Sequence, residues 1–458
     1  MPVEVLALSV FVVIFLLGTL RPVNMGAIAL VGAFLVGWLI YDVDVETVLA
    51  GFPGSMFVIL VGVTYLFGIA GYNGTVEKLV QAAVVTVRGR TGLVPWTMFL
   101  VPAALTAVGA AAPAACAIVI PIALKFAAKH RINRVMMSMM VIQGTTAGGF
   151  SPIGIYGVIV NDLGDKAGLP NNPGLLFAGT FFTTFVLAGI AFLTLGGRDL
   201  MSRRTHSTTT AVTKTVPVTA GSVGGETIVA TGGPAENSTG HTAGSGTTSG
   251  DANEPTGNGR FSLEQLCTMT GILGVVFMTL VFDLDVGFVS LTIAVALSLI
   301  FTKSAQEAVG KVAWPTVLLI CGIITYVSLL QDQGTIDWLG SGIADFDAPL
   351  LAAIVILFIG AVVSAFASTT ALLGVVVPLA TPFLLTDQIG VTAFIIALAV
   401  SSSVVDCSPL STMGALAVAN AEEDKRSKVF SGLMRWGLSL IIIAPIVTFL
   451  VLVLPSAA

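Results

Sequence analysis

The sequence predicts an all-α polytopic membrane protein made of two inverted repeats, with about ten transmembrane helices and two re-entrant hairpins. Two observations predict this class: the composition of the chain and a pair of matching interruptions in its apolar segments. The 458 residues are 55% hydrophobic and 10% charged, with a mean hydropathy of +0.98. A soluble domain carries about 25% charged residues, so the composition indicates a chain that crosses a membrane several times.

The matching interruptions are two Ser-Pro pairs that lie 257 residues apart. The residues that match at this separation are Ser151 and Ser408, Pro152 and Pro409, Pro121 and Pro378, and Gly157 and Gly414. Matches at one separation without a gap indicate an internal repeat. Proline removes an amide donor and clashes with the preceding turn, so each helix must break there. Because broken backbone at membrane depth is tolerated only inside protein or along a cavity, two such breaks point to a transport site.

Each half of the chain contains five apolar stretches close to the ~20 residues that cross a bilayer. We expect spans near 5–20, 24–41, 54–71, 135–160, 173–196, 265–283, 286–302, 313–330, 392–420 and 436–455, of which 135–160 and 392–420 are broken. The longer stretches 93–127 and 347–386 have small or hydroxyl-bearing residues at their centres, and we expect each to form a re-entrant hairpin. The first repeat then covers 1–200 and the second covers 261–458.

The distribution of basic residues agrees with this threading. It places 19 of the 20 Lys and Arg residues on one side of the membrane and leaves Lys166 on the other. Basic residues mark the cytoplasmic side, so we expect a multi-pass protein of the inner, or plasma, membrane with both termini outside. The segment 201–260 is rich in Thr, Ser and Gly, which predicts a disordered cytoplasmic linker between the repeats.

Several classes of function are disfavoured by what the sequence lacks. The four cysteines show no metal-ligand spacing, and all three histidines fall in loops, so we expect neither a metal centre nor a histidine proton relay. No Ser/His/Asp set or cofactor fingerprint appears at membrane depth, which argues against an enzyme and predicts no cofactor. The net charge of −5, without a basic patch, predicts no nucleic-acid partner.

Helix ends at the breaks and hairpin tips are the best candidates for a substrate site. The free amides and the positive dipole end of a helix N-terminus hold carboxylates without a formal charge, and neighbouring hydroxyls can donate beside them. We found no Arg or Lys at membrane depth that would take this role. The candidate substrate-binding residues are Ser151, Pro152, Ser368, Thr369, Thr370, Ser408, Pro409, Ser411 and Thr412.

Asp406 is the one carboxylate deep in a broken span, two residues before Ser408. An acid inside a membrane is costly and is functional by default, so Asp406 is a candidate cation ligand or proton carrier. Exposed carbonyls at the breaks and tips can complete a Na+ site. The candidate cation-binding residues are Asp406, Thr369, Cys407, Phe150 and Ala111. The residue that matches Asp406 in the first repeat is Gly149, so the two half-sites are chemically unequal.

The stretches SSSVVDCSPLSTMGALAVANA and QGTTAGGFSPIGIYG resemble the bacterial malonate/dicarboxylate carrier family and, more distantly, the divalent anion:sodium symporters of the ion transporter superfamily. The resemblance covers the chain apart from the linker. It implies an elevator-type transporter, usually a homodimer, that binds a dicarboxylate between hydroxyl-bearing hairpin tips and Ser-Pro breaks. Ser368-Thr369-Thr370 matches one tip motif, whereas Ala111-Ala112-Pro113 replaces the Ser-Asn-Thr pattern expected at the other.

The leading hypothesis is symport of a small dicarboxylate, such as malonate or succinate, with Na+ favoured over H+ as the coupling ion. Its expected partners are the anion, the coupling cation, the lipid bilayer and a second copy of the chain. The alternative is a cation/proton antiporter on the same scaffold, for which Asp406 would be the exchanging acid. A third hypothesis, a membrane enzyme or receptor, does not need inverted repeats with broken helices.

Overall fold

The computed structural model describes residues 2–21, 23–86, 91–202, 261–282, 284–336, 338, 349–365, 369–384 and 389–457. Every regular element within these ranges is a helix, and the all-α prediction is confirmed. The predicted linker lies outside the described residues apart from 201–202, and so does the candidate site residue Ser368.

The helices follow the predicted spans closely. In the first half they are α1 (Val3–Leu20), α2 (Met25–Leu39), α3 (Val45–Ala50), α4 (Gly54–Tyr72), α5 (Thr75–Thr86), η1 (Thr91–Leu93), α6 (Val94–Ala107), α7 (Ala112–Lys129), α8 (Arg134–Gly149), α9 (Ile155–Lys166), α10 (Pro173–Thr194) and α11 (Gly197–Ser202). In the second half they are α12 (Leu263–Phe282), α13 (Val286–Ile300), α14 (Thr302–Val309), α15 (Trp314–Asp332), α17 (Pro349–Ser364), α18 (Thr369–Leu384), α19 (Val391–Ser403), η2 (Val404–Cys407), α20 (Thr412–Ala419), α21 (Glu423–Thr448), η3 (Phe449–Val453) and α22 (Leu454–Ser456).

Among the described residues, seven helical segments are long and apolar enough to cross a membrane, and the multi-pass membrane class is confirmed. The seven are Gly54–Tyr72, Ala112–Lys129, Pro173–Thr194, Leu263–Phe282, Trp314–Asp332, Val391–Ala419 and Glu423–Ser456. Five shorter apolar helices, α1, α2 and α13 among them, accompany these segments. The total of ten spans and the re-entrant path of the two hairpins stay predictions.

Helix boundaries recur at the separation of 257 residues that the Ser-Pro pairs show. The boundaries that match are the ends of α6 and α17 at Ala107 and Ser364, the starts of α7 and α18 at Ala112 and Thr369, the starts of α8 and α19 at Arg134 and Val391, and the starts of α9 and α20 at Ile155 and Thr412. The separation of 257 residues seen in a few residues is therefore also found between the boundaries of whole helices.

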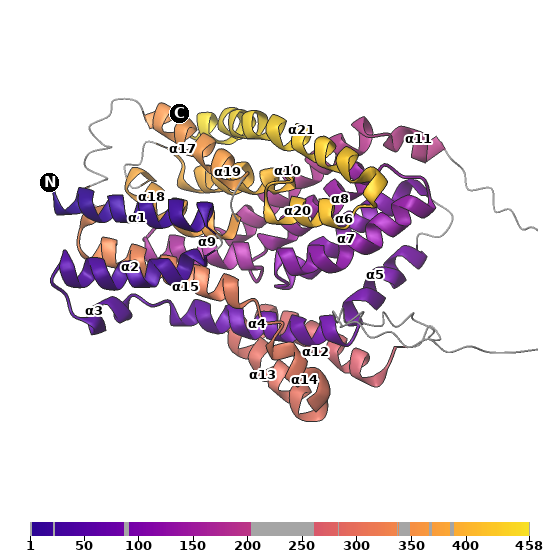
Figure 1. Cartoon of the computed structure of the whole chain (residues 1–458), viewed down its shortest axis with the longest axis horizontal. Coiled ribbons are helices and arrows are strands. Elements are labelled where there is room, and N and C mark those ends of the chain that lie inside the picture. Colours follow the sequence, from indigo (N-terminus) through magenta and orange to yellow (C-terminus); the bar gives the residue numbers. More distant parts are fainter. Residues whose placement is uncertain are drawn as a thin grey trace, which may run out of the picture. The chain divides into compact units, whose positions relative to one another are not determined.

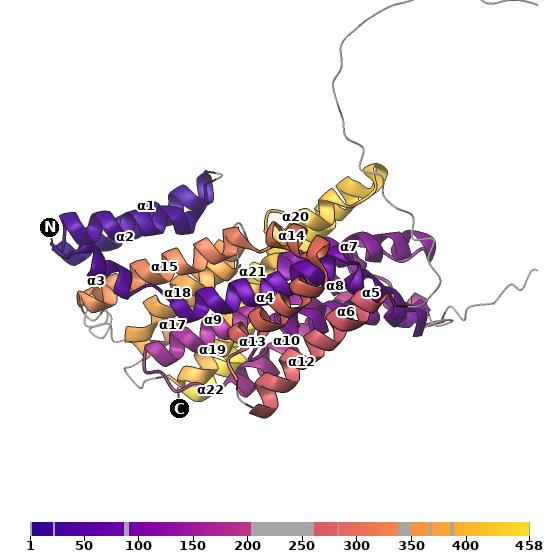
Figure 2. The ribbon, with the colours of Figure 1, turned by 90° about the horizontal axis from the view of Figure 1, so that it is seen from below.

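Contacts sort the helices into two groups. In the frame group, which comprises α1–α4 and α12–α15, α4 packs on α13 and α2 packs on α15. In the core group, which comprises α6–α10 and α17–α22, α8 packs between α6 and α10, and α19 contacts both α17 and α21. The two groups meet mainly where α15 contacts α18, and α5, which belongs to neither group, contacts helices of both. Both ribbon views show α4, α13 and α14 side by side (Figures 1 and 2).

Glycines set the close helix crossings of the frame group. A β-carbon on Gly26 of α2 would lie 1.9 Å from the carbonyl oxygen of Leu318 on α15, and one on Gly62 of α4 would lie 2.4 Å from that of Gly287 on α13. Small residues let helix backbones approach closely in membranes, where packing drives helix association. These crossings hold the frame helices of the two halves against each other.

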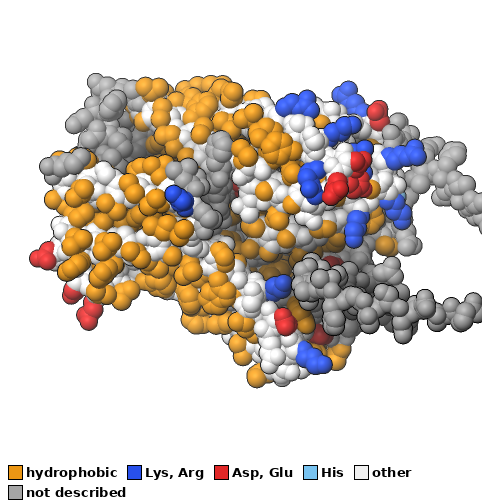
Figure 3. Space-filling model, in the orientation of Figure 1, with side chains coloured by type: hydrophobic (Ala, Val, Ile, Leu, Met, Phe, Trp, Pro, Cys, Tyr) orange, Lys and Arg blue, Asp and Glu red, His pale blue; other side chains and the backbone are white. Residues whose placement is uncertain are grey.

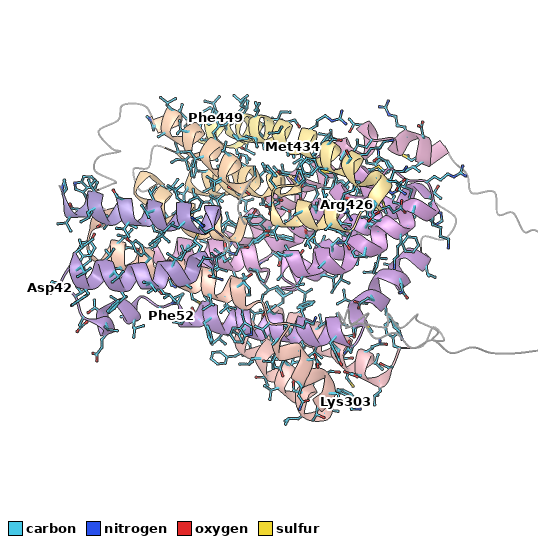
Figure 4. All side chains as sticks on the ribbon, viewed as in Figure 1. Asp42, Phe52, Lys303, Arg426, Met434 and Phe449 are labelled. Atoms are coloured by element: carbon cyan, nitrogen blue, oxygen red, sulfur yellow. The ribbon has the colours of Figure 1, made fainter. Side chains whose placement is uncertain are left out.

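Side chains show a clear polarity along the bundle. In Figure 3 the visible Lys and Arg side chains gather toward one end of the molecule, and an apolar surface covers much of the rest. Figure 4 places the labelled Arg426 and Lys303 toward that end and Asp42 at the opposite one. Arg426 and Lys303, which the sequence assigns to one side, thus lie away from Asp42 in the fold (Figure 4).

Candidate functional site

The two helix breaks have the same backbone hydrogen bonds. In the first break the Ser151 amide donates to the Gly148 carbonyl at 2.9 Å, and in the second the Ser408 amide donates to the Val405 carbonyl at 2.8 Å. A β-carbon on Gly414 would lie 1.9 Å from the Ser408 carbonyl oxygen. Its repeat counterpart, Gly157, lies equally close to the Ser151 carbonyl, at 2.0 Å. The glycine matched by sequence is therefore needed in each copy because the returning helix crosses the break at this point.

In the second break the hydroxyl of Ser411 is committed to the backbone. It accepts from the Gly414 amide at 3.3 Å as the N-cap of α20, and it lies 2.5 Å from the Asp406 carbonyl and 2.8 Å from the Ser408 carbonyl, to which it can donate. The Ser408 hydroxyl accepts from the Leu410 amide at 3.3 Å. These bonds satisfy the amides and carbonyls that Pro409 and the short η2 turn leave without helical partners.

Asp406 lies at the centre of a buried polar cluster. Its side chain is 3% exposed, and its Oδ2 accepts a 2.5 Å hydrogen bond from the Thr369 hydroxyl. The Ser364 hydroxyl lies 3.0 Å from that of Thr369. No ion pair between described residues includes Asp406, so hydroxyl groups rather than a basic side chain surround this acid. The predicted cation ligands Asp406 and Thr369 are in direct contact.

The remaining cation candidates are Cys407, the chain neighbour of Asp406, then Phe150, and Ala111, which is the N-cap of α7. Cys407 is buried, and its thiol lies 3.3 Å from the Val404 carbonyl. Phe150 is buried at the end of α8, where its ring packs 5.3 Å from that of Tyr156. The Tyr156 hydroxyl interacts with the Thr370 side chain. Tyr156 also lies close enough to Asp406 for an electrostatic interaction between the two. The α9 helix of the first half thus reaches the α18 tip of the second.

The first break lacks the polar side chains that surround Asp406 in the second break. Ser151 donates a hydrogen bond to the Ala107 carbonyl at the end of α6, and Ala107 is the repeat counterpart of Ser364. The counterparts of Thr369 and Asp406 are Ala112 and Gly149. Each polar side chain of the Asp406 cluster is therefore replaced by Ala or Gly in the first copy, and the described residues contain one such cluster.

A cavity of about 660 Å³ lies next to the second break, where the frame and core groups meet. We call it the site cavity. The described residues that line it are Gly18, Asn24, Met25, Ala111, Pro113, Ala114, Lys311, Ala313, Pro315, Thr316, Leu319, Thr370, Leu410, Ser411, Thr412 and Ala415. Of the predicted substrate-binding residues, Thr370, Ser411 and Thr412 line it. Ser151, Pro152, Ser408, Pro409 and Thr369 lie outside its lining, and Ser368 is not described.

Three helices begin at this cavity. The N-cap of α7 is Ala111, the second residue of α18 is Thr370, and the N-cap of α20 is Ser411. Since a helix N-terminus carries free amides and a partial positive charge, the cavity is bordered by donors that suit an anion. Asn24, which also lines it, uses its side chain to cap α2 and to donate to the Pro315 carbonyl at 2.9 Å.

Lys311 is the residue that sequence analysis missed. It is exposed, and it is the only charged side chain among the described residues that line the site cavity. The predicted threading placed it among the basic residues of the cytoplasmic side, just before the span expected near 313–330. The one available signal was its place directly before a predicted span, which sequence alone does not distinguish from an ordinary loop lysine.

Comparisons with known proteins bear on the fold and the family of the chain. Residues 1–149 match the family model described as the dicarboxylate carrier protein MatC N-terminus. The crystal structure of the YdaH transporter of Alcanivorax borkumensis has a similar fold, with a TM-score of 0.58 and 14% sequence identity over 89% of each chain. A search of curated protein sequences found no match. The resemblance to the dicarboxylate carrier family is thereby confirmed over the first 149 residues.

Proposed function

We propose that this protein is a secondary active transporter that carries a small dicarboxylate, such as malonate or succinate, together with a cation across the plasma membrane. The site cavity is the observation that carries the proposal. The N-termini of α7, α18 and α20 meet there, and Lys311 is the one charged residue among the described residues that line it. Helix ends and a lysine favour a carboxylate. A volume of about 660 Å³ leaves ample room for a four-carbon diacid.

The Asp406 cluster is the proposed cation site. A carboxylate and two hydroxyls are hard oxygen ligands of the kind that Na+ prefers. Thr369, which contacts Asp406, is adjacent in sequence to Thr370, which lines the site cavity. A cation that orders Thr369 at the start of α18 therefore also orders the anion site, and this link couples the two ligands.

We propose that the frame group stays fixed in the membrane while the core group moves with the substrate, as in an elevator. The sorting of contacts into two groups supports this division, because each group packs more extensively within itself than against the other. Exposed apolar side chains on α12 and α13, including Phe277 and Phe288, give the frame group a face for lipid or for a second copy in a homodimer.

The proposed orientation places the basic end of the bundle in the cytoplasm and both termini outside. The separation of Arg426 and Lys303 from Asp42 supports it (Figure 4). The site cavity is bordered by Asn24 and Lys311, which lie in loops assigned to the basic side. In this orientation the structure corresponds to a conformation that exposes the site toward the cytoplasm.

A cation/proton antiporter that uses Asp406 is the second candidate function. The burial of Asp406 favours it, since an antiporter needs an exchanging carboxylate. The antiporter gives no role to the meeting of three helix N-termini and Lys311 in one cavity. Dicarboxylate symport explains both features and is therefore preferred.

Uptake by proteoliposomes tests the proposal directly. Labelled malonate and succinate should accumulate when an inward Na+ gradient is imposed, and an inward proton gradient should be less effective. Accumulation under the proton gradient alone would indicate that H+ is the coupling ion. If neither anion enters under any gradient while an imposed Na+ gradient drives proton efflux, the protein is an antiporter and the symport proposal is wrong.

A further inference from the structure

Lys311 borders a second cavity as well as the site cavity. This side cavity has a volume of about 450 Å³ and lies between α4, α5 and the first turns of α7. Its described lining residues are Thr64, Phe67, Gly68, Gly71, Tyr72, Glu77, Ala111, Ala114, Ala117, Ile118, Lys311 and Ala313. Ala111, Ala114, Lys311 and Ala313 line both cavities, so the two are neighbours across the Lys311 side chain.

Glu77 gives the side cavity a negative charge. It lies on the amphipathic helix α5, which is too short to cross the membrane. Its Oε2 is buried and has no hydrogen-bond partner among the described residues. Burial raises the pKa of Glu77, although a bond from its own amide lowers it in part. A buried carboxylate oxygen without a partner is unfavourable, because it has lost water and gained nothing in exchange.

Lys311 is the charged group best placed to satisfy that oxygen. Lys311 takes part in no ion pair between described residues. The adjacent lysine on α5, Lys78, instead lies 5.5 Å from the centre of the Phe261 ring. The lysine side chain is a flexible stem with a compact charge, so Lys311 can turn toward either cavity without a backbone change.

The backbone of Lys311 is anchored to the frame group. The Ala313 amide donates to the Thr64 hydroxyl on α4 at 3.3 Å, and the Lys311 amide donates to the Ala308 carbonyl at 2.9 Å. Gly68 of α4 packs against this loop, since a β-carbon there would lie 3.2 Å from that of Lys311. Thr370 and Ser411, by contrast, belong to the core group. An anion in the site cavity therefore bridges a charge on the frame and helix ends on the core.

We infer that Lys311 selects dianions by binding one carboxylate of the substrate in the site cavity, and that a turn of its side chain away from the position in this structure lets it pair with Glu77 in the side cavity. This inference rests on the proposed function and names the residue that distinguishes a dicarboxylate from a monocarboxylate. The helix N-termini of the core group hold one carboxylate and Lys311 holds the other. Glu77 competes with the substrate and lowers its apparent affinity.

The test compares malonate with its monoamide, malonamate, which has nearly the same shape but carries one carboxylate. Binding is measured with the purified full-length protein by ligand-dependent thermal stabilisation, and half-saturating concentrations are measured by uptake. The wild-type protein should prefer malonate. Lys311→Gln should weaken malonate binding about tenfold, the expected loss for one hydrogen bond to a charged group, and should leave malonamate binding nearly unchanged. Lys311→Arg should retain most of the preference.

Two further variants make the test specific. Lys303→Gln removes a lysine of α14 that lines neither cavity (Figure 4), and it should keep the preference of the wild type. Glu77→Gln should strengthen malonate binding in the wild-type background and have no effect beside Lys311→Gln, since a coupled pair is non-additive.

The possible results distinguish a failure of this inference from a failure of the proposed function. If malonate stabilises the wild type and Lys311→Gln retains the full preference for malonate, the inference is wrong and the proposed function stands. Equal loss of malonate and malonamate binding in Lys311→Gln also overturns it, because that result indicates a structural role. If neither malonate nor succinate binds to or is transported by the wild type, both the inference and the proposed function fail.

Discussion

The hydroxyl of Thr369 donates a 2.5 Å hydrogen bond to the carboxylate of Asp406 and so connects the tip of the α17–α18 pair to the break between α19 and α20. Both residues are nearly inaccessible to solvent. A buried acid that is held by hydroxyls and has no basic partner in the described chain is the arrangement expected of a site that a cation enters and leaves. This contact is the centre of the proposed coupling mechanism.

Replacing Asp406 with Asn should lower transport and raise the Na+ concentration needed for half-maximal uptake. The amide keeps the shape of the side chain and its bond to Thr369 but removes the charge that binds the cation. Uptake is measured in proteoliposomes over a series of Na+ concentrations. A variant that loses its response to a pH gradient but still exchanges internal for external substrate would assign a proton to Asp406. Normal transport under both gradients would show that Asp406 is structural.

Substitutions at the cavity hydroxyls should affect substrate affinity more than those at the breaks. Thr412→Val should raise the half-saturating malonate concentration about tenfold, because a hydrogen bond to a charged group contributes roughly 1.5–3 kcal/mol. Ser151→Ala is the matched comparison, since that hydroxyl is committed to the Ala107 carbonyl and lies outside the cavity lining. If Ser151→Ala raises the half-saturating malonate concentration more than Thr412→Val does, the substrate binds at the first break instead.

Labelling of single cysteines should report the orientation of the bundle. In a background without the four native cysteines, Pro2→Cys and Asp42→Cys should react with an impermeant thiol reagent on intact cells. Lys303→Cys and Lys425→Cys should react only after the membrane is made permeable, because positive charges remain in the cytoplasm. Labelling of Lys303→Cys on intact cells would contradict the proposed orientation.

The Gly26→Ala variant should be clearly less stable than the wild type. Its new methyl group would lie 1.9 Å from the Leu318 carbonyl oxygen, and overpacking of this kind costs about 1–3 kcal/mol. Thermal unfolding in detergent measures the effect. Gly54→Ala is the control, because a β-carbon there meets nothing within 4 Å. An unchanged transition temperature in Gly26→Ala would mean that the α2–α15 crossing can spread without loss.

Local features of the sequence predicted the helices and their breaks well. Proline and glycine at fixed positions decide where a helix stops, and the prediction of breaks at Ser151-Pro152 and Ser408-Pro409 therefore depended on backbone chemistry alone. Asp406 was also found from the sequence, because an acidic residue within a long apolar segment is easily recognised. The helices α6, α17 and α18 lie within the predicted hairpin stretches, and α7 begins within the first of them.

The lining of the cavity depended on tertiary contacts that sequence does not show. The hydroxyls of Ser151 and Ser408 looked equivalent to those of Thr370 and Thr412, yet the first two bond to nearby backbone and the other two line the cavity. Lys311 was counted with the loop charges, and its place beside the site follows from the anchoring of its loop to α4. Which side chain faces a cavity is decided by packing between distant segments.

The difference between the two repeat copies has an electrical consequence. The residues that precede Ser364, Thr369 and Asp406 by 257 positions are Ala107, Ala112 and Gly149, so the proposed cation site occurs once in the described chain. A dianion that moves with a single cation leaves one negative charge uncompensated in each cycle. An inside-negative potential opposes that movement by about 2.3 kcal/mol per 100 mV. Uptake would then slow as the membrane hyperpolarises, and efflux would be favoured in an energised cell.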